Sequence, residues 1–318
     1  MKTAFTGFLV LVCAAALGAQ AEETLHSYER IFIRSGLAAK ADVLRDAATD
    51  DSAAEFYGPL CDFALRFAVD NAGLFWRDPD MINVVVLALK GVEETRYQPA
   101  SETLIQVFLC YEDNVIRYPV LKTLPLLVEG DLAAFFRRLL LNGDPVKKLA
   151  AFNMFLTAGN PDVRERGEMA EAALEAGLAY QENGERGEIR ELRAAAAKVI
   201  GETAWVRALT LVLMYYNRSM ASYRSDPSYK EDLIASIDCL SALGSVSAAQ
   251  TLSLQLGLYH SQADSLNDDD RDLVLSTVRA LGRLGYKASS DVLRQAVTLP
   301  YTEEIQIAAQ DSLSRLKW

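Results

Sequence analysis

The chain has 318 residues, of which 51% are hydrophobic, and its formal net charge at pH 7 is −11. Because a negatively charged surface repels phosphate groups, this balance argues against nucleic acid or an anionic lipid surface as the main partner. The local basic group Arg137, Arg138, Lys147 and Lys148 is typical of a solvated helix face. The apolar fraction is sufficient for a large core, and an array of stacked repeats can hold a chain of this length in one domain.

The first residues have the pattern of a signal peptide. Lys2 supplies the positive charge, Phe8 to Leu17 form an apolar core, and Ala19-Gln20-Ala21 is a small-x-small cleavage site. We expect cleavage near Ala21, which removes residues 1–21 and leaves a periplasmic or secreted protein. Lipidation of Cys13 is the alternative, although the preceding residue in such signals is small and Val12 is not. No stretch reaches the roughly 20 apolar residues of a membrane span, so we expect a soluble mature chain with no transmembrane segment.

Residues 22–318 are predicted to form a single helical domain, because apolar residues recur at helical spacing between Gly, Asn, Asp and Pro. Residues 22–78 resemble degenerate N-terminal capping repeats, with a break near Gly36 and a loop around Trp76. Residues 79–318 contain clearer repeats. The expected helical pairs are 80–92 with 101–111, 113–128 with 132–141, 146–158 with 163–180, 187–200 with 205–216, 230–243 with 248–258, and 271–284 with 290–298, followed by 302–316.

Local signals refine these boundaries. Pro119 and Pro125 predict a bent or broken helix, because each lacks an N–H group and crowds the preceding turn. Asp131 and Asn160 are expected N-caps. The segment 219–229 is predicted to be an insert between helices.

Two C-terminal helices repeat with a period of about 41 residues. Ile237 and Leu240 superpose on Val278 and Leu281, and Gly244 superposes on Gly285, where a left-handed C-cap is expected. The predicted core stripe of the later helix is Leu275, Val278, Leu281 and Leu284.

The segments VRALGRLGYKASSDVL (278–293), IDCLSALGSVSAAQTL (237–252) and EEIQIAAQDSLSRL (303–316) resemble HEAT repeats of the bacterial type also found in phycobilisome-lyase-like proteins. This resemblance implies an all-α, armadillo-type, right-handed α-solenoid of about six to seven stacked helical hairpins. It also implies that the second helices line a concave face that binds protein. It implies no lyase activity, because many proteins without an enzymatic role share the repeat.

Residues that could support catalysis or hold a metal are sparse. The only histidines are His26 and His260, near opposite ends of the expected array, so a histidine-rich metal site is excluded and a catalytic triad is disfavoured. Asp264, Asp268 and Asp270 are the candidate calcium ligands, but their loop lacks the glycine and final glutamate of an EF-hand. Carboxylates in this position are more typical of helix capping. We therefore expect no catalytic residue, metal or cofactor.

The cysteines of the mature chain have no metal-binding or redox spacing. Cys61, Cys110 and Cys239 could all be buried thiols, or Cys61 and Cys110 could form a disulfide in an oxidising compartment.

Aromatic residues provide the candidates for partner binding. The predicted helix 205–216 is apolar on nearly all faces, so either neighbouring repeats or a partner must cover it. Trp205, Tyr216, Tyr223 and Trp76 are the candidate anchors for a protein partner. The predicted function is an exported, non-catalytic scaffold or adaptor. The alternatives are an envelope enzyme or enzyme subunit with carboxylates on the concave face, and a carrier of an apolar ligand.

Overall fold

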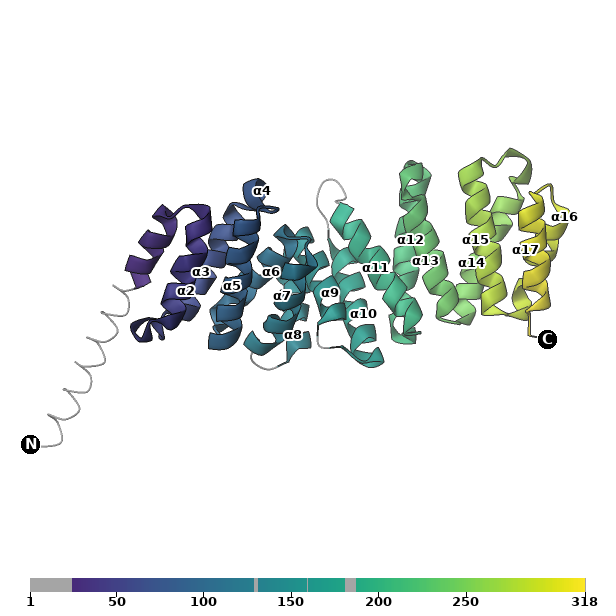
Figure 1. Ribbon diagram of the computed structural model, residues 1–318. Helices are drawn as coiled ribbons and strands as arrows, with labels where there is room; N and C mark the ends of the chain where they lie inside the picture. The colour runs from purple at the N-terminus through teal and green to yellow at the C-terminus, as the bar shows by residue number, and fades with distance from the viewer. Residues whose placement is uncertain (1–24, 129–130, 159, 181–186, 318) are drawn as a thin grey trace, which may run out of the picture. The chain divides into compact units, whose positions relative to one another are not determined.

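The computed structural model describes residues 25–128, 131–158, 160–180 and 187–317. The predicted signal peptide and Cys13 lie outside these ranges. Helices make up the regular structure of the described residues, and the only β-pairing among them is an isolated bridge between Tyr286 and Lys317 (Figure 1). The prediction of an all-α array of stacked helices is confirmed. None of the described helices is long and apolar enough to cross a bilayer.

The chain divides into two compact units. The first contains the described residues up to Phe135 together with 157–158, and the second contains 136–156 and the described residues from Asn160 onward. The boundary falls inside α8 (Leu132–Asn142).

The first unit is a stack of helices around a central α5. It contains a helix over residues 25–34, then α2 (Leu37–Thr49), α3 (Tyr57–Asp70), α4 (Ala72–Phe75), α5 (Pro79–Thr95), α6 (Ser101–Cys110), α7 (Asn114–Leu127) and the start of α8. Helix α5 packs against α2, α3 and α7, and α6 packs against α3 and α7. The break expected near Gly36 is present between the first two helices.

Helix α7 is not broken at its prolines, so of the bent or broken helix expected there the broken alternative is wrong. It continues through Pro119 and Pro125 as one element. Buried residues lie on both sides of each proline, namely Ile116, Val120, Leu124 and Leu127. Tertiary packing therefore maintains the helix despite the missing N–H groups.

The second unit contains α9 (Pro145–Thr157), α10 (Val163–Ala179), α11 (Gly187–Glu202), α12 (Leu209–Ser225), α13 (Lys230–Ala242), α14 (Val246–His260), α15 (Asp268–Leu284), α16 (Ser290–Thr298) and α17 (Glu303–Ser314), as well as the end of α8. Helices α11, α13, α15 and α17 pack side by side in that order, and we call them the first layer. Helices α12, α14 and α16 each pack most extensively against the first-layer helix that follows them in the sequence. The closest helical pairs are thus shifted by one helix from the predicted hairpins.

Two boundaries differ from the sequence prediction. Most of the expected insert continues α12 to Ser225, because Ser219, Met220 and Tyr223 lie in the core. Asn160 is not the cap of α10, since Asp162 accepts the N–H of Glu165 in a capping box. The predicted left-handed glycines are confirmed, with φ of +63° at Gly244 and +70° at Gly285.

Candidate functional site

A groove of about 830 Å³ lies over three first-layer helices of the second unit, α13, α15 and α17. Each helix contributes side chains at spacings of three or four residues, so one face of each helix lines the groove. The lining includes Glu231, Ile234 and Asp238 from α13, then Asp272, Leu275, Arg279 and Arg283 from α15, and Glu304, Ile307, Asp311 and Arg315 from α17 and its end.

Two hydrogen bonds at the helix ends, one from a side chain and one from the backbone, show which of these side chains are level with one another. The Tyr286 hydroxyl donates to the carbonyl oxygen of Gly244 at 2.6 Å, and the Lys317 N–H donates to that of Gly285 at 2.9 Å. Positions about 41 residues apart on α13 and α15, and about 32 apart on α15 and α17, are therefore level. Three rows cross the groove. The acidic row is Glu231, Asp272 and Glu304, the apolar row is Ile234, Leu275 and Ile307, and the mixed row is Asp238, Arg279 and Asp311.

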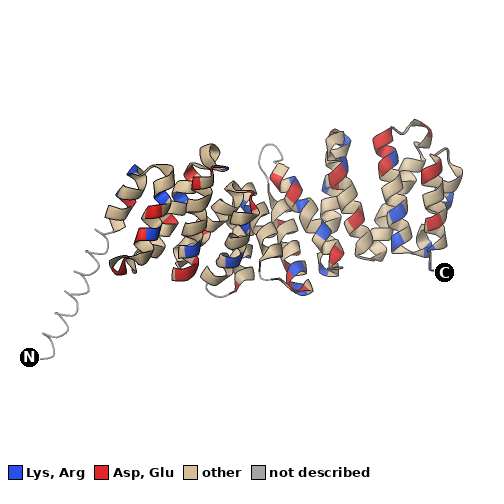
Figure 2. Cartoon of the chain, viewed as in Figure 1, with Lys and Arg blue, Asp and Glu red and all other residues tan. Residues whose placement is uncertain are grey.

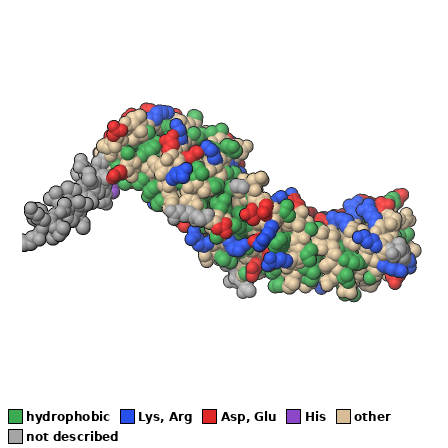
Figure 3. All heavy atoms as spheres, turned by 90° about the horizontal axis from the view of Figure 1, so that it is seen from below, with side chains coloured by type: hydrophobic (Ala, Val, Ile, Leu, Met, Phe, Trp, Pro, Cys, Tyr) green, Lys and Arg blue, Asp and Glu red, His purple; other side chains and the backbone are tan. Residues whose placement is uncertain are grey.

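The distribution of charge along the helices is uneven. Figure 2 shows acidic residues near the N-terminal turns of α15 and α17 and basic residues toward their other ends. Seen from below, Lys and Arg side chains gather over the C-terminal helices (Figure 3). Arg283 and Arg315 lie at the basic end of the groove.

Ion pairs join neighbouring first-layer helices across the groove. Arg283 pairs with Asp238, and Arg279 pairs with Glu304 at 2.9 Å. Because these side chains are about half exposed, each pair contributes only about 0–1 kcal/mol to stability. Their main effect is to hold charged groups at set positions on the surface.

Lys230 is held by two carboxylates at the acidic end. Its Nζ lies 2.7 Å from Asp269 and 2.9 Å from Asp272. These hydrogen bonds, to Asp269 first, raise the pKa of Lys230, so the amine stays protonated and cannot act as a general base near neutral pH. Elsewhere in the groove, Glu231 and Glu303 have no ion-pair partner within the described part of the chain.

A second groove of about 540 Å³ lies between α11 and α13. Its walls carry small side chains, namely Ala194, Ala195, Ala197 and Gly201 from α11 and Ala235, Cys239 and Ala242 from α13. Glu191, Lys198, Glu202 and Asp238 complete its lining. Asp238 also lines the larger groove, so the two form one continuous surface from α11 to α17. The resemblance to HEAT repeats implied binding by second helices, whereas these grooves lie over first helices.

The acidic loop before α15 has a structural role. The Asn267 side chain accepts the N–H of Asp270 at 2.8 Å, and Asp270 accepts the Tyr223 hydroxyl at 3.0 Å. Asp268 pairs with Arg271. Among the described residues, no group of three or more His, Cys, Asp or Glu side chains could hold a metal ion, so Asp264, Asp268 and Asp270 do not converge as calcium ligands.

Two of the aromatic candidates are core residues. Tyr216 is 3% exposed and Tyr223 is 8% exposed, because α12 packs along α13 and also contacts α10. Their selection as exposed partner anchors is therefore corrected. The helical pattern identified apolar faces, but it did not show that neighbouring helices cover them.

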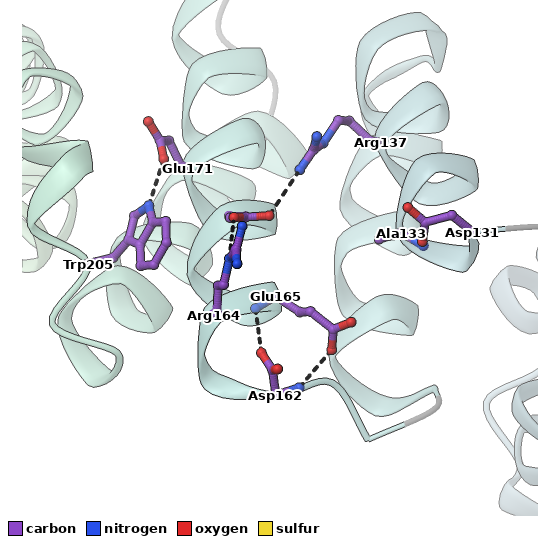
Figure 4. Close-up of polar contacts among 9 residues, drawn as sticks. Asp131, Ala133, Arg137, Asp162, Arg164, Glu165, Glu171 and Trp205 are labelled. Atoms are coloured by element: carbon purple, nitrogen blue, oxygen red, sulfur yellow. Dashed lines mark hydrogen bonds and ion pairs between the residues drawn. The ribbon is translucent and has the colours of Figure 1, made fainter.

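Trp205 is docked against α10 within the second unit (Figure 4). Its Nε1–H donates to Glu171 at 2.6 Å. A β-carbon at Gly167 would lie 2.6 Å from the indole, so that glycine makes room for the ring. Nearby, Glu168 lies 2.9 Å from Arg164 and 4.0 Å from Arg137, which links α8 to α10. These contacts make Trp205 part of the framework, although its side chain stays half-buried.

Trp76 belongs to the other unit. It follows α4, is half-buried, and has the Arg77 guanidinium 3.9 Å from its ring centre. The neighbouring Leu74 is 79% exposed. Trp76 therefore remains a candidate contact, but it is not part of the grooves of the second unit.

The cysteines and histidines have structural surroundings. Cys61, Cys110 and Cys239 are free thiols, so the disulfide alternative is wrong for this structure. Burial raises the pKa of Cys61 and of Cys239 to about 12, which keeps both thiols protonated and unreactive. His26 lies 3.0 Å from Glu29 on the first helix, whereas His260 joins α14 to Val292 and Tyr301.

The apolar pattern does not predict the grooves, although the sequence contains a signal for them. The 41-residue period of the apolar core positions also aligns polar positions, Glu231 with Asp272 and Asp238 with Arg279. A period that extends to exposed side chains indicates a patterned surface as well as a repeated core.

Comparisons with known proteins give a structural likeness only. No family model matches the sequence, and no curated protein matches it. Among solved structures, the chain is similar to a designed armadillo repeat protein, with 16% sequence identity and a TM-score of 0.40, over 73% of this chain and 98% of that one.

Proposed function

We propose that the chain is an exported, non-catalytic adaptor that binds a segment of a partner protein in the groove over α13, α15 and α17. The observation that carries this proposal is the groove itself, where three neighbouring helices present level rows of charged and apolar side chains. Repeated, outward-facing side chains on stacked helices form the extended surfaces that repeat proteins use for binding.

The charges of the groove support recognition in preference to catalysis. Arg279, Arg283 and Lys230 are each paired with a carboxylate of a neighbouring helix, and the Ser312 hydroxyl donates to the carbonyl oxygen of Val278. These contacts hold the groove walls together.

Export is supported by the signal-peptide pattern of residues 1–21, and N-terminal sequencing of the mature protein should begin at Glu22. A mature chain that retains Met1 would contradict cleavage.

Site-specific photo-cross-linking tests the adaptor function. A benzophenone amino acid replaces Ile307, which is 51% exposed in the groove, or Leu254, which is 74% exposed on α14. After irradiation of cells that make the protein natively, we expect a discrete adduct from position 307 and none from position 254. Glu303→Lys should abolish the adduct at 307. No adduct at 307, or an equal adduct at 254, would overturn the proposal.

A second candidate function is the carriage of an apolar ligand, which the alanine-lined groove between α11 and α13 favours. N-phenyl-naphthylamine should then gain fluorescence on binding the protein, and Ala194→Phe, at a half-exposed position, should remove that gain by filling the groove. An unchanged signal in this variant would exclude the groove as the ligand site.

A further inference from the structure

We infer that the segment bound in the groove is a basic peptide in the polyproline II conformation that crosses the first-layer helices with an apolar residue at every third position. This inference rests on the proposed function and adds the chemistry of the partner. Charge, the position of the apolar row and the spacing of the helices lead to it.

The charge of the surface selects a cationic partner. The lining of the larger groove includes six carboxylates and four cationic side chains. Glu231 and Glu303 face it without an ion-pair partner among the described residues. The alanine-lined groove adds Glu191, which is about 40 residues before Glu231 and extends the acidic row to α11.

Helix capping does not explain the whole acidic row. Helix α15 already has Asp268, Asp269 and Asp270 in its first turn, where carboxylates complement the helix dipole. Glu191 lies beyond the first turn of α11 and faces the alanine-lined groove. Asp272 also lies beyond the first turn and lines the larger groove, where it accepts a hydrogen bond from Lys230. An electrostatically complementary segment therefore has Lys or Arg side chains along this row.

The apolar row lies one helical turn from the acidic row. Ile307 is 51% exposed, and Ile234 and Leu275 are half-buried at the groove floor. Leu275 belongs to the stripe predicted as core, but α17 leaves it partly uncovered. A segment that follows this row can bury apolar side chains on it while its cations reach the carboxylates.

The spacing of the helices decides the conformation of the segment. Packed helices lie about 8–10 Å apart, so each row offers one position per 8–10 Å. Polyproline II repeats its face every three residues, or about 9.3 Å, which matches this interval. A β-strand repeats its face about every 6.6 Å and an α-helix about every 5.4 Å. A polyproline II segment also has no unpaired strand edge and needs no internal hydrogen bonds.

Three labelled 12-residue peptides test this inference by fluorescence anisotropy with the full mature chain. The (Leu-Lys-Pro)4 peptide has the required charge and period, (Leu-Glu-Pro)4 reverses the charge, and (Leu-Lys)6 changes the period. We expect (Leu-Lys-Pro)4 to bind at least about tenfold more tightly than either other peptide, and its affinity to fall as salt rises from about 50 to about 200 mM. Equal binding of (Leu-Glu-Pro)4 or of (Leu-Lys)6 would overturn the inference.

Matched variants separate groove binding from net charge. Glu231→Lys with Glu303→Lys should weaken (Leu-Lys-Pro)4 binding at least tenfold. Glu175→Lys with Asp291→Lys makes the same change in net charge at exposed positions outside the groove. This control should leave the affinity for (Leu-Lys-Pro)4 within about twofold of that of the unchanged protein. Equal losses in both variants would overturn the inference, and an unchanged melting temperature excludes unfolding as the cause. If the cross-link from position 307 forms but (Leu-Lys-Pro)4 does not bind, the partner chemistry is wrong and the adaptor function stands. If both fail, both proposals fail.

Discussion

At the scale of single residues, two buried lysines close the ends of helices. Lys40 Nζ donates to the carbonyl oxygens of Phe32 and Ile33, and Lys148 Nζ donates to those of Leu140 and Leu141. The last carbonyls of a helix have no partner within it, and they carry the negative end of the dipole. Burial lowers the pKa of both lysines. The sequence reading of Lys148 as a solvated side chain is therefore corrected.

Replacing Lys148 with methionine should destabilise the protein. Methionine fills the space of the lysine stem but leaves the carbonyls of α8 without their donor, which costs about 1–3 kcal/mol. Urea denaturation measures the free energy of unfolding. Lys147→Met is the control, since the Lys147 side chain is 43% exposed and its loss should change stability by no more than about 0.5 kcal/mol. Equal effects of the two substitutions would contradict the capping role.

Tyr216→Ala should also destabilise the protein, by about 3–5 kcal/mol, because it leaves a cavity where a buried aromatic ring was packed. Met214→Ala on the same helix is the control, since Met214 is 53% exposed. Both are measured by urea denaturation. A stable Tyr216→Ala variant would restore this residue as a candidate binding anchor.

At the scale of elements, a half-buried histidine ties α14 to the end of the array. His260 Nε2 lies 2.8 Å from the Val292 carbonyl oxygen, and its Nδ1 lies 2.9 Å from the Tyr301 hydroxyl. A carbonyl can only accept, so Nε2 carries the proton and, in the neutral ring, Nδ1 accepts from Tyr301. Burial lowers the pKa of His260 below its ordinary value of 6.5.

Acid should weaken this connection. As pH falls, the unfolded chain binds a proton at His260 at a higher pH than the folded chain does, because folding lowers the pKa. The contribution of neutral His260 to stability is complete above pH 6.5 and is lost as pH falls toward the lowered pKa. We expect hydrogen exchange in α14 and α16 to rise between pH 7 and pH 5, after correction for intrinsic exchange rates. His260→Gln should show a smaller rise because glutamine does not titrate. The same pH dependence in both proteins would contradict this role.

At the scale of the whole molecule, both units bury groups that resist losing a proton. Burial raises the pKa of Tyr111 in the first unit, and of Tyr259 and Tyr301 in the second, to about 12 in each case. Cys61 and Cys239 have the same value and cause. In both units, the stability of the core therefore depends on buried groups that keep their protons.

The free energy of unfolding should therefore fall at alkaline pH. These groups ionise in the unfolded chain near 9.0 for cysteine and 10.0 for tyrosine, but they stay protonated in the folded chain. Their contribution is complete below pH 9 and is lost as pH rises toward about 12. The two buried lysines have lowered pKa values, so their effect on the free energy of unfolding has the opposite sign. The tyrosines and cysteines with raised pKa values outnumber them. Urea denaturation at pH 8, 10 and 11 measures the change, and Cys239→Ala should reduce the part that begins near pH 9. Constant stability from pH 8 to 11 would contradict the prediction.

Helix positions could be read from the sequence because they depend on residues close together in the chain. Apolar spacing predicted most helices to within a few residues, and Gly244 and Gly285 marked turns whose conformation needs no distant contact. Which apolar positions are covered, and which charges face each other, depends on helices far away in the sequence. Leu275 and Leu281 share one predicted stripe, yet Leu281 is fully buried and Leu275 lines a groove. Only the packing of α13, α15 and α17 decided that difference, because burial depends on which neighbour lies against each side chain.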